Sequence, residues 1–66
     1  MSTTDTRDRL LDAAERLFSE QGLEATSLRA ITAQASANLA SIHYHFGSKE
    51  ALIQEVFARR LGPLND

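Results

Sequence analysis

The sequence contains no cysteine and no tryptophan, one proline, three glycines and no long apolar run. Without cysteine, neither a disulfide framework nor a thiolate metal site can stabilise the chain. No apolar stretch approaches the roughly 18 residues that cross a bilayer, and residues 1–5 lack the basic start and apolar stretch of a signal peptide. We therefore expect a soluble, cytoplasmic protein with no membrane partner. Its 66 residues suffice for one small domain at most.

Basic residues are not in excess either: seven Lys and Arg stand against nine Asp and Glu, and the net charge is −2. This total argues against DNA binding, because phosphate contacts come from Lys and Arg. The distribution argues for it, because residues 26–49 contain Arg29, Lys49, His43 and His45 and no carboxylate. A short chain can lack carboxylates over 24 residues by chance. This carboxylate-free segment therefore indicates DNA binding only if a motif inside it does so as well.

Apolar residues are plentiful, at 42% of the chain, and they recur at helical spacing. Between Arg7 and Gln21 they form one stripe with a 3.6-residue period, made of Leu10, Leu11, Ala13, Ala14, Leu17 and Phe18. The stripe predicts a first helix. Thr4, Asp5 or Thr6 can cap its start, and Gly22 can take the left-handed conformation that ends a helix.

Three shorter helices are predicted after this one. The second begins after Thr26, the expected N-cap, and ends near Gln34 or Ala35; the third begins after Asn38, the next good N-cap. Their apolar positions are Leu28, Ile31 and Ala35, then Leu39, Ile42 and Phe46. The fourth follows Gly47-Ser48, ends at Gly62-Pro63 and buries Leu52, Ile53, Val56, Phe57 and Leu61.

These elements predict an all-α fold. It is a small helical bundle with a three-helix, homeodomain-like helix-turn-helix at about residues 27–46, followed by the start or all of a fourth helix. Many small helical bundles share this outline, so the outline alone does not indicate a function.

Residues 26–52 carry a more specific signal, reading TSLRAITAQASANLASIHYHFGSKEAL. This stretch resembles the helix-turn-helix signature of the tetracycline-repressor (TetR) family of transcriptional regulators, most closely at residues 44–52 and the preceding Asn38-Leu39-Ala40. The residues Leu11-Asp12-Ala13-Ala14, Leu17-Phe18, Gly22 and Thr26 extend the resemblance to nearly the whole chain. Residues 1–66 are then one DNA-binding domain.

The resemblance implies a sequence-specific regulator of transcription, a repressor released from DNA by a ligand. Its partner would be a palindromic operator in double-stranded DNA, bound by a homodimer in the intact protein. Such regulators carry a C-terminal domain that dimerises and binds a small-molecule effector. That domain is absent from this chain, so we expect the 66-residue piece to be monomeric. No cofactor is implied.

Four positions depart from the family pattern. Ser36 stands where glycine is usual in the turn, and Ala37 where a larger apolar residue is usual. Because Ser tolerates a positive φ less readily than Gly, the turn either avoids that conformation or carries strain. His43 replaces the more frequent Tyr, and Leu39 replaces Lys, Arg or Gln. The last two changes bear on which bases are read.

The second helix of a helix-turn-helix points its N-terminal end at base edges in the major groove. Asn38, Leu39, Ala40 and His43 are therefore the candidate base contacts, and the small Ala40 and Ser41 allow close approach. The resemblance assigns Tyr44 and His45 to phosphates, and Ser27 and Arg29 to the flanking backbone. Lys49 adds its charge to helix N-terminal amides that favour an anion. The predicted DNA-binding site is Ser27, Arg29, Asn38, Leu39, Ala40, Ser41, His43, Tyr44, His45 and Lys49.

Plainer interpretations remain open. Arg29 and Lys49 can be ordinary solvated charges, Tyr44 a partly buried aromatic residue, and Leu39 a core residue. At the end of the last helix, Arg59 and Arg60 most simply complement its dipole.

An enzyme is disfavoured, because two histidines two residues apart on a helix point about 200° from one another and cannot chelate one metal ion. A helical protein-interaction module without DNA binding is the alternative function. The acidic first helix and the net negative charge would suit it.

Overall fold

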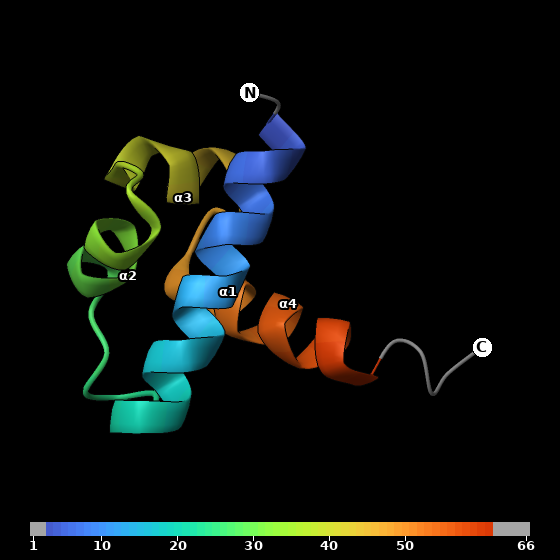
Figure 1. Cartoon of the computed structure of the whole chain (residues 1–66). Coiled ribbons are helices and arrows are strands. Elements are labelled where there is room, and N and C mark those ends of the chain that lie inside the picture. The colour runs from blue at the N-terminus through green and yellow to red at the C-terminus, as the bar shows by residue number, and fades with distance from the viewer. Residues whose placement is uncertain (1–2, 62–66) are drawn as a thin grey trace.

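The computed structural model describes residues 3–61, and within that range the chain forms four α-helices and no strand. They are α1 (Thr3–Gln21), α2 (Leu28–Ala35), α3 (Leu39–His45) and α4 (Lys49–Leu61) (Figure 1). The all-α prediction is confirmed. The predicted helix end at Gly62-Pro63 lies outside the described residues.

The long helix α1 is the centre of the molecule, because it contacts each of the other three helices. In Figure 1, α2 and α3 lie on one side of α1, and the C-terminal half of α4 extends towards the other side. The core contains the whole apolar stripe predicted for α1 except the half-buried Phe18, together with residues from each other helix. Its buried members are Leu10, Leu11, Ala13, Ala14, Leu17, Ile31, Ala35, Ile42, Leu52 and Val56.

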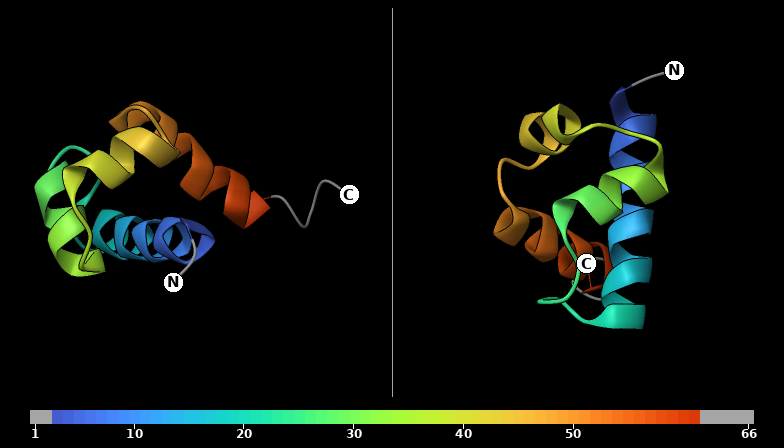
Figure 2. Two further views of the ribbon diagram at one scale, coloured as in Figure 1. Left: turned by 90° about the horizontal axis from the view of Figure 1, so that it is seen from above. Right: turned by 90° about the vertical axis from the view of Figure 1, so that its left-hand side faces the viewer.

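The predicted stripe of α4 is wrong in its second half. Leu52 and Val56 are buried, but the side chains of Phe57 and Leu61 are 53% and 52% exposed. The reason is the direction of α4, whose C-terminal half extends away from α2 and α3 (Figures 1 and 2). A helical period identifies an apolar face, but it does not say how far along the helix a neighbour covers that face.

Two predicted N-caps are also wrong. The helix α1 begins at Thr3, so Thr4, Asp5 and Thr6 lie inside the helix rather than at its cap. Thr26 does not cap α2; it is buried, and its hydroxyl faces the end of α1, 2.8 Å from the carbonyl oxygen of Gly22 and 3.2 Å from that of Leu17. The single hydroxyl proton is shared between these two carbonyl oxygens, so Thr26 ties the segment before α2 to the end of α1.

The predicted stop at Gly22 is confirmed: its φ is 92°, in the left-handed region. Its amide donates to the carbonyl oxygen of Phe18 over 2.9 Å, which closes the last turn of α1.

Ion pairs join α1 to α4 along its length. Near the start of α1, Arg7 Nη2 lies 2.7 Å from Glu55 Oε1, and its guanidinium stands 5.4 Å from the centre of the Phe46 ring. At the far end of α4, Arg59 contacts Asp12 and Glu15 at 2.9 and 2.8 Å. Arg60 contacts the other Glu15 oxygen at 2.9 Å. Arg59 and Arg60 therefore bind carboxylates of α1 directly. The sequence predicted only that they complement the dipole of the last helix.

Candidate nucleic-acid interface

The turn between α2 and α3 is a Schellman motif with serine at its left-handed position. Ser36 has φ 55° and ψ 47°, and its amide donates to the Ala33 carbonyl over 3.3 Å. The amide of Ala37 donates to the Thr32 carbonyl over 2.9 Å, which completes the pair of bonds that defines this motif. Of the two possibilities for Ser36, the structure therefore has the strained one, because a Cβ is disfavoured at positive φ.

The cap residues of the two short helices differ in how well the sequence predicts them. Asn38 caps α3 as expected: its Oδ1 accepts from the Ser41 amide over 3.0 Å and from the Ser41 hydroxyl over 3.2 Å. Ser27, rather than Thr26, caps α2 by accepting from the Ala30 amide over 3.1 Å. Ser27 is thus an exposed capping residue in the structure.

The surface of α3 carries most of the predicted base contacts. Ile42 is fully buried, whereas Leu39, Ala40, His43 and Tyr44 are exposed. Leu39 is 42% exposed and Tyr44 is 76% exposed, so neither is a core residue and both open alternatives for them are excluded. Ser41 and His45 are half-buried, and the His45 ring packs edge-to-face against Tyr44 with 4.9 Å between ring centres.

His43 also contacts the turn that follows α3. Its Nδ1 lies 3.4 Å from the carbonyl oxygen of Gly47, a long hydrogen bond in which a proton on Nδ1 is the donor. In the neutral tautomer with its proton on Nδ1, Nε2 carries the lone pair and can accept a hydrogen bond. An acceptor at this place suits an exocyclic amine, such as adenine N6 or cytosine N4.

The free cations of the described chain lie inside the carboxylate-free segment. Within residues 3–61, every arginine outside residues 26–49 forms an ion pair with a carboxylate; these are Arg7, Arg9, Arg16, Arg59 and Arg60. Over the same range, Arg29 and Lys49 pair with no carboxylate. Lys49 is half-buried at the first turn of α4, next to the Ser48 hydroxyl that caps this helix by accepting from the Ala51 amide over 3.1 Å.

The ten predicted site residues lie at the N-cap and first turn of α2, at the N-cap of α3 and along α3, and at the start of α4, and none of them is buried. The two views of Figure 2 show α3 and the first turn of α4 together on one side of α1. Sequence reasoning missed Arg9, which reaches the turn between α2 and α3 from α1. No local signal could have found it, because 26 residues separate it from its partner, Ala35.

The described residues support neither a metal site nor a membrane-spanning helix. Over residues 3–61, no three histidine or acidic side chains gather where they could hold a metal ion. In the same part of the chain, every helix is too short or too polar to span a membrane.

The sequence matches a known family over residues 10–56, the family described as bacterial regulatory proteins, tetR family. Among curated proteins, the chain is 42% identical over 64 residues to the HTH-type nicotine-responsive transcriptional repressor HdnoR of Paenarthrobacter nicotinovorans. That alignment covers 97% of this chain and 33% of the relative.

Two further relatives match a shorter stretch. The HTH-type transcriptional regulator UidR of Escherichia coli (strain K12) is 43% identical over 51 residues, covering 77% of this chain and 26% of the relative. The HTH-type transcriptional repressor KstR2 of Rhodococcus jostii (strain RHA1) is 44% identical over 50 residues, covering 76% and 24%. The chain therefore spans a third or less of the length of these relatives.

Proposed function

Because this chain belongs to the tetR family of bacterial regulatory proteins, we propose that it reads a palindromic DNA operator by inserting α3 into the major groove. The chain is a DNA-binding regulator of transcription and not an enzyme, as the sequence predicted. The proposal concerns the finer points: which residues touch DNA, which touch bases, and how the whole protein assembles.

The unpaired cations carry this proposal. Ion pairing neutralises the arginines of α1 and α4 within the protein, so they have little charge to offer an external partner. Arg29 and Lys49 lie in the carboxylate-free segment and keep their charge for phosphates on either side of α3. A net charge of −2 is therefore compatible with DNA binding, because five of the acidic residues, Asp5, Asp12, Glu15, Glu20 and Glu55, pair with arginines, and residues 26–49 contain no carboxylate.

Each side chain of the site has a role in this proposal that follows from its geometry. Leu39 and Ala40 offer apolar contact to a thymine methyl group, and His43 accepts from a base amine. The Nδ2 group of Asn38 donates outward, because its Oδ1 is occupied by the cap. Ser41 permits close approach. The remaining members, Ser27, Arg29, Tyr44, His45 and Lys49, contact phosphates and fix the register.

We further propose that the intact protein is a cytoplasmic homodimer and a repressor that a small molecule releases from DNA. The names of two relatives support repression, since HdnoR and KstR2 are both called transcriptional repressors. The dimer contacts and the effector site are assigned to a C-terminal domain outside these 66 residues, so this piece alone is a monomer.

The proposal is tested by selecting duplexes from a randomised pool with the intact protein, which the proposal makes a homodimer. Mobility shift then compares binding of the selected duplex with that of a shuffled duplex of the same composition. We expect a clear preference for an inverted repeat. Lys49→Ala should weaken binding, whereas Arg16→Ala should not, because Arg16 pairs with Glu20 on α1 and lies outside the site. Equal binding of selected and shuffled duplexes would instead favour the protein-interaction module.

A further inference from the structure

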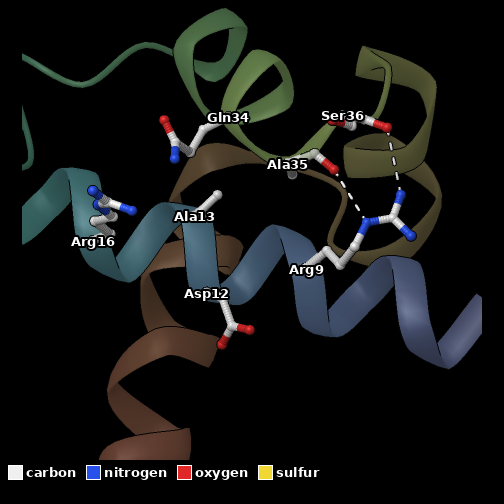
Figure 3. A pocket seen from close by; sticks show the side chains of 7 residues that line it. All are labelled: Arg9, Asp12, Ala13, Arg16, Gln34, Ala35 and Ser36. Atoms are coloured by element: carbon white, nitrogen blue, oxygen red, sulfur yellow. Dashed lines mark hydrogen bonds between the residues drawn. The ribbon is translucent and has the colours of Figure 1, made fainter.

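Arg9 connects α1 to the turn that precedes α3. Its Nε donates to the Ala35 carbonyl oxygen over 3.1 Å, and its Nη2 lies 3.4 Å from the Ser36 carbonyl oxygen. Figure 3 shows the side chain crossing from α1 with both bonds drawn. Asp5, one turn earlier on α1, holds Nη1 at 2.8 Å. The Nε–Nη2 edge of the guanidinium therefore contacts backbone carbonyls, and Nη1 binds a carboxylate.

Two features of the turn favour a positively charged hydrogen-bond donor such as Arg9. Its two carbonyls belong to the C-terminal end of α2, where oxygens lack helical partners and the helix dipole is negative. The turn also contains the strained Ser36, with φ 55° where a Cβ is disfavoured. A cation that donates to both carbonyls favours the left-handed turn over extended alternatives, because successive carbonyls of an extended backbone point in opposite directions.

The position of the turn sets the position of α3. Only Ala37 lies between Ser36 and Asn38, the cap on which α3 begins. A small change at Ser36 therefore moves the first turn of α3, which carries Leu39 and Ala40. Base contacts require that turn to sit at a fixed depth and angle in the groove, whereas contacts from long cationic side chains to phosphates tolerate displacement.

We propose that Arg9 is a positioning residue for DNA reading: by binding the Ala35 and Ser36 carbonyls it fixes the left-handed turn and hence the orientation of α3. Arg9 itself touches no base or phosphate in this account. The proposal rests on the proposed function, and it assigns a role in sequence discrimination to a residue outside the predicted site.

Arg16 provides a matched control on the same helix. It lies two turns after Arg9 and lines the same open hollow between α1 and the end of α2 (Figure 3). Its guanidinium pairs with Glu20 and makes no bond to the turn. Replacing either arginine removes one positive charge from α1, so a difference between the two variants reports the contact with the turn.

The measured quantity is the ratio of the dissociation constants for the shuffled duplex and for the duplex selected by the wild-type protein. A loss of folded protein lowers both affinities by the same factor and leaves this ratio unchanged. A displaced α3 lowers affinity for the selected duplex more than for the shuffled one. The ratio thus separates positioning from a role in stability alone.

We expect Arg9→Met, which keeps the apolar stem, to reduce the ratio by about tenfold, the effect of losing hydrogen bonds from one charged donor. Arg9→Lys should retain part of the ratio, because an ammonium group can reach one carbonyl but lacks the planar fork. Arg16→Met should leave it unchanged. In the free protein, hydrogen exchange at the Ala37 amide should accelerate in Arg9→Met and stay at the wild-type rate in Arg16→Met.

A second substitution links the effect to the turn. Ser36→Gly removes the strain, so in the Arg9→Met background it should restore part of the ratio, while it changes the wild-type ratio little. An unchanged ratio in Arg9→Met overturns the positioning role, even where the wild-type protein selects an inverted repeat. If the wild-type protein selects no sequence, the proposed function fails first and the positioning role falls with it.

Discussion

At the scale of single residues, the most informative position is one where the sequence departs from the family pattern. Ser36 occupies a left-handed turn that glycine usually fills, and the fold keeps the turn despite the added Cβ. The Schellman bonds at Ser36 and Ala37 and the contact with Arg9 together hold it there. Local strain is thus balanced by a long-range contact, and this balance can be measured.

Ser36→Gly should raise the thermal midpoint. Removing the Cβ from the left-handed position should raise the free energy of unfolding by about 1–2 kcal/mol. The greater freedom of glycine in the unfolded chain should lower it by about 0.4–1 kcal/mol. The net gain of roughly 0.5 kcal/mol corresponds to about 2–4 °C for a domain of this size. Ser19→Gly is the control, because Ser19 is exposed inside α1 and the same change there should lower the midpoint. A lower midpoint for Ser36→Gly would mean that the serine is not strained.

Lys49 and His43 should affect DNA binding in different ways. Lys49→Ala should weaken binding to all duplexes and reduce the slope of log affinity against log salt by about 1, because one phosphate contact is lost. His43→Ala should change the preference at one base pair by about 1–3 kcal/mol. Titrations of both variants against single-base variants of the selected duplex, at several salt concentrations, measure both effects. The opposite pattern would reverse these two roles.

At the scale of helices, the sequence predicts what local chemistry decides. All four helices, the stop at Gly22 and the cap at Asn38 could be predicted, because period, glycine and a side-chain oxygen act within a few residues. The choice between Thr26 and Ser27 could not, since adjacent hydroxyls are equally able to cap and only the packing of α1 buries the first. The exposure of Phe57 and the contacts of Arg9 also depend on how distant segments meet.

The same distinction applies to the candidate interface. A motif selects the ten residues, and the structure adds that none is buried and that Arg29 and Lys49 are unpaired within residues 3–61. Composition alone gives a net charge of −2, which argues against DNA as the partner. The pairs of Arg9 with Asp5 and of Arg16 with Glu20 follow from their i,i+4 spacing on α1, but the pairing of Arg7, Arg59 and Arg60 depends on how α1 and α4 pack and is invisible in the sequence.

The contact between α1 and α4 should weaken in acid. The hydrogen bond from Arg59 holds the pKa of Glu15 below its ordinary value of 4.5, with Arg60 adding to the effect and burial opposing it. A carboxyl whose pKa is lowered on folding stabilises the fold above its ordinary pKa, and this stability is lost as pH falls through the lowered value. Reciprocally, the bond to Glu15 raises the pKa of Arg59.

Glu15→Gln should therefore lower the thermal midpoint at pH 7 and make the midpoint less sensitive to pH below about 4.5 than in the wild type. Melting curves recorded from pH 7 to pH 3 measure this. Glu20→Gln is the control, because Glu20 pairs only with Arg16 on its own helix and contributes no contact between α1 and α4. Parallel midpoint curves for Glu15→Gln and wild type would show that this ion pair does not contribute to the acid response.

At the scale of the whole molecule, paired and unpaired charges lie in different parts of the chain. Acidic residues and arginines pair between α1 and α4, beside the apolar core, while the segment of residues 26–49 that includes α3 has no carboxylate. Under the proposed function, this arrangement gives one small surface for DNA. One such surface reaches one half-site, so tight binding to an inverted repeat requires two copies held at the right separation.

The 66-residue chain should therefore be monomeric in dilute solution and bind the selected inverted repeat weakly, as two independent half-sites. Joining two modules makes the second contact intramolecular and can raise affinity by about 10²–10⁴-fold without new contacts. A tandem of two copies, joined by a flexible linker long enough to span the half-sites, should recover much of that gain while keeping the same base preferences. Sedimentation of the single chain, with titrations of a half-site, the full repeat and a repeat with altered spacing, measures each part of this. A single chain that sediments as a stable dimer and binds the full repeat as tightly as the tandem would place the dimer contacts within these helices, where the exposed Phe57 and Leu61 of α4 would be the first residues to replace.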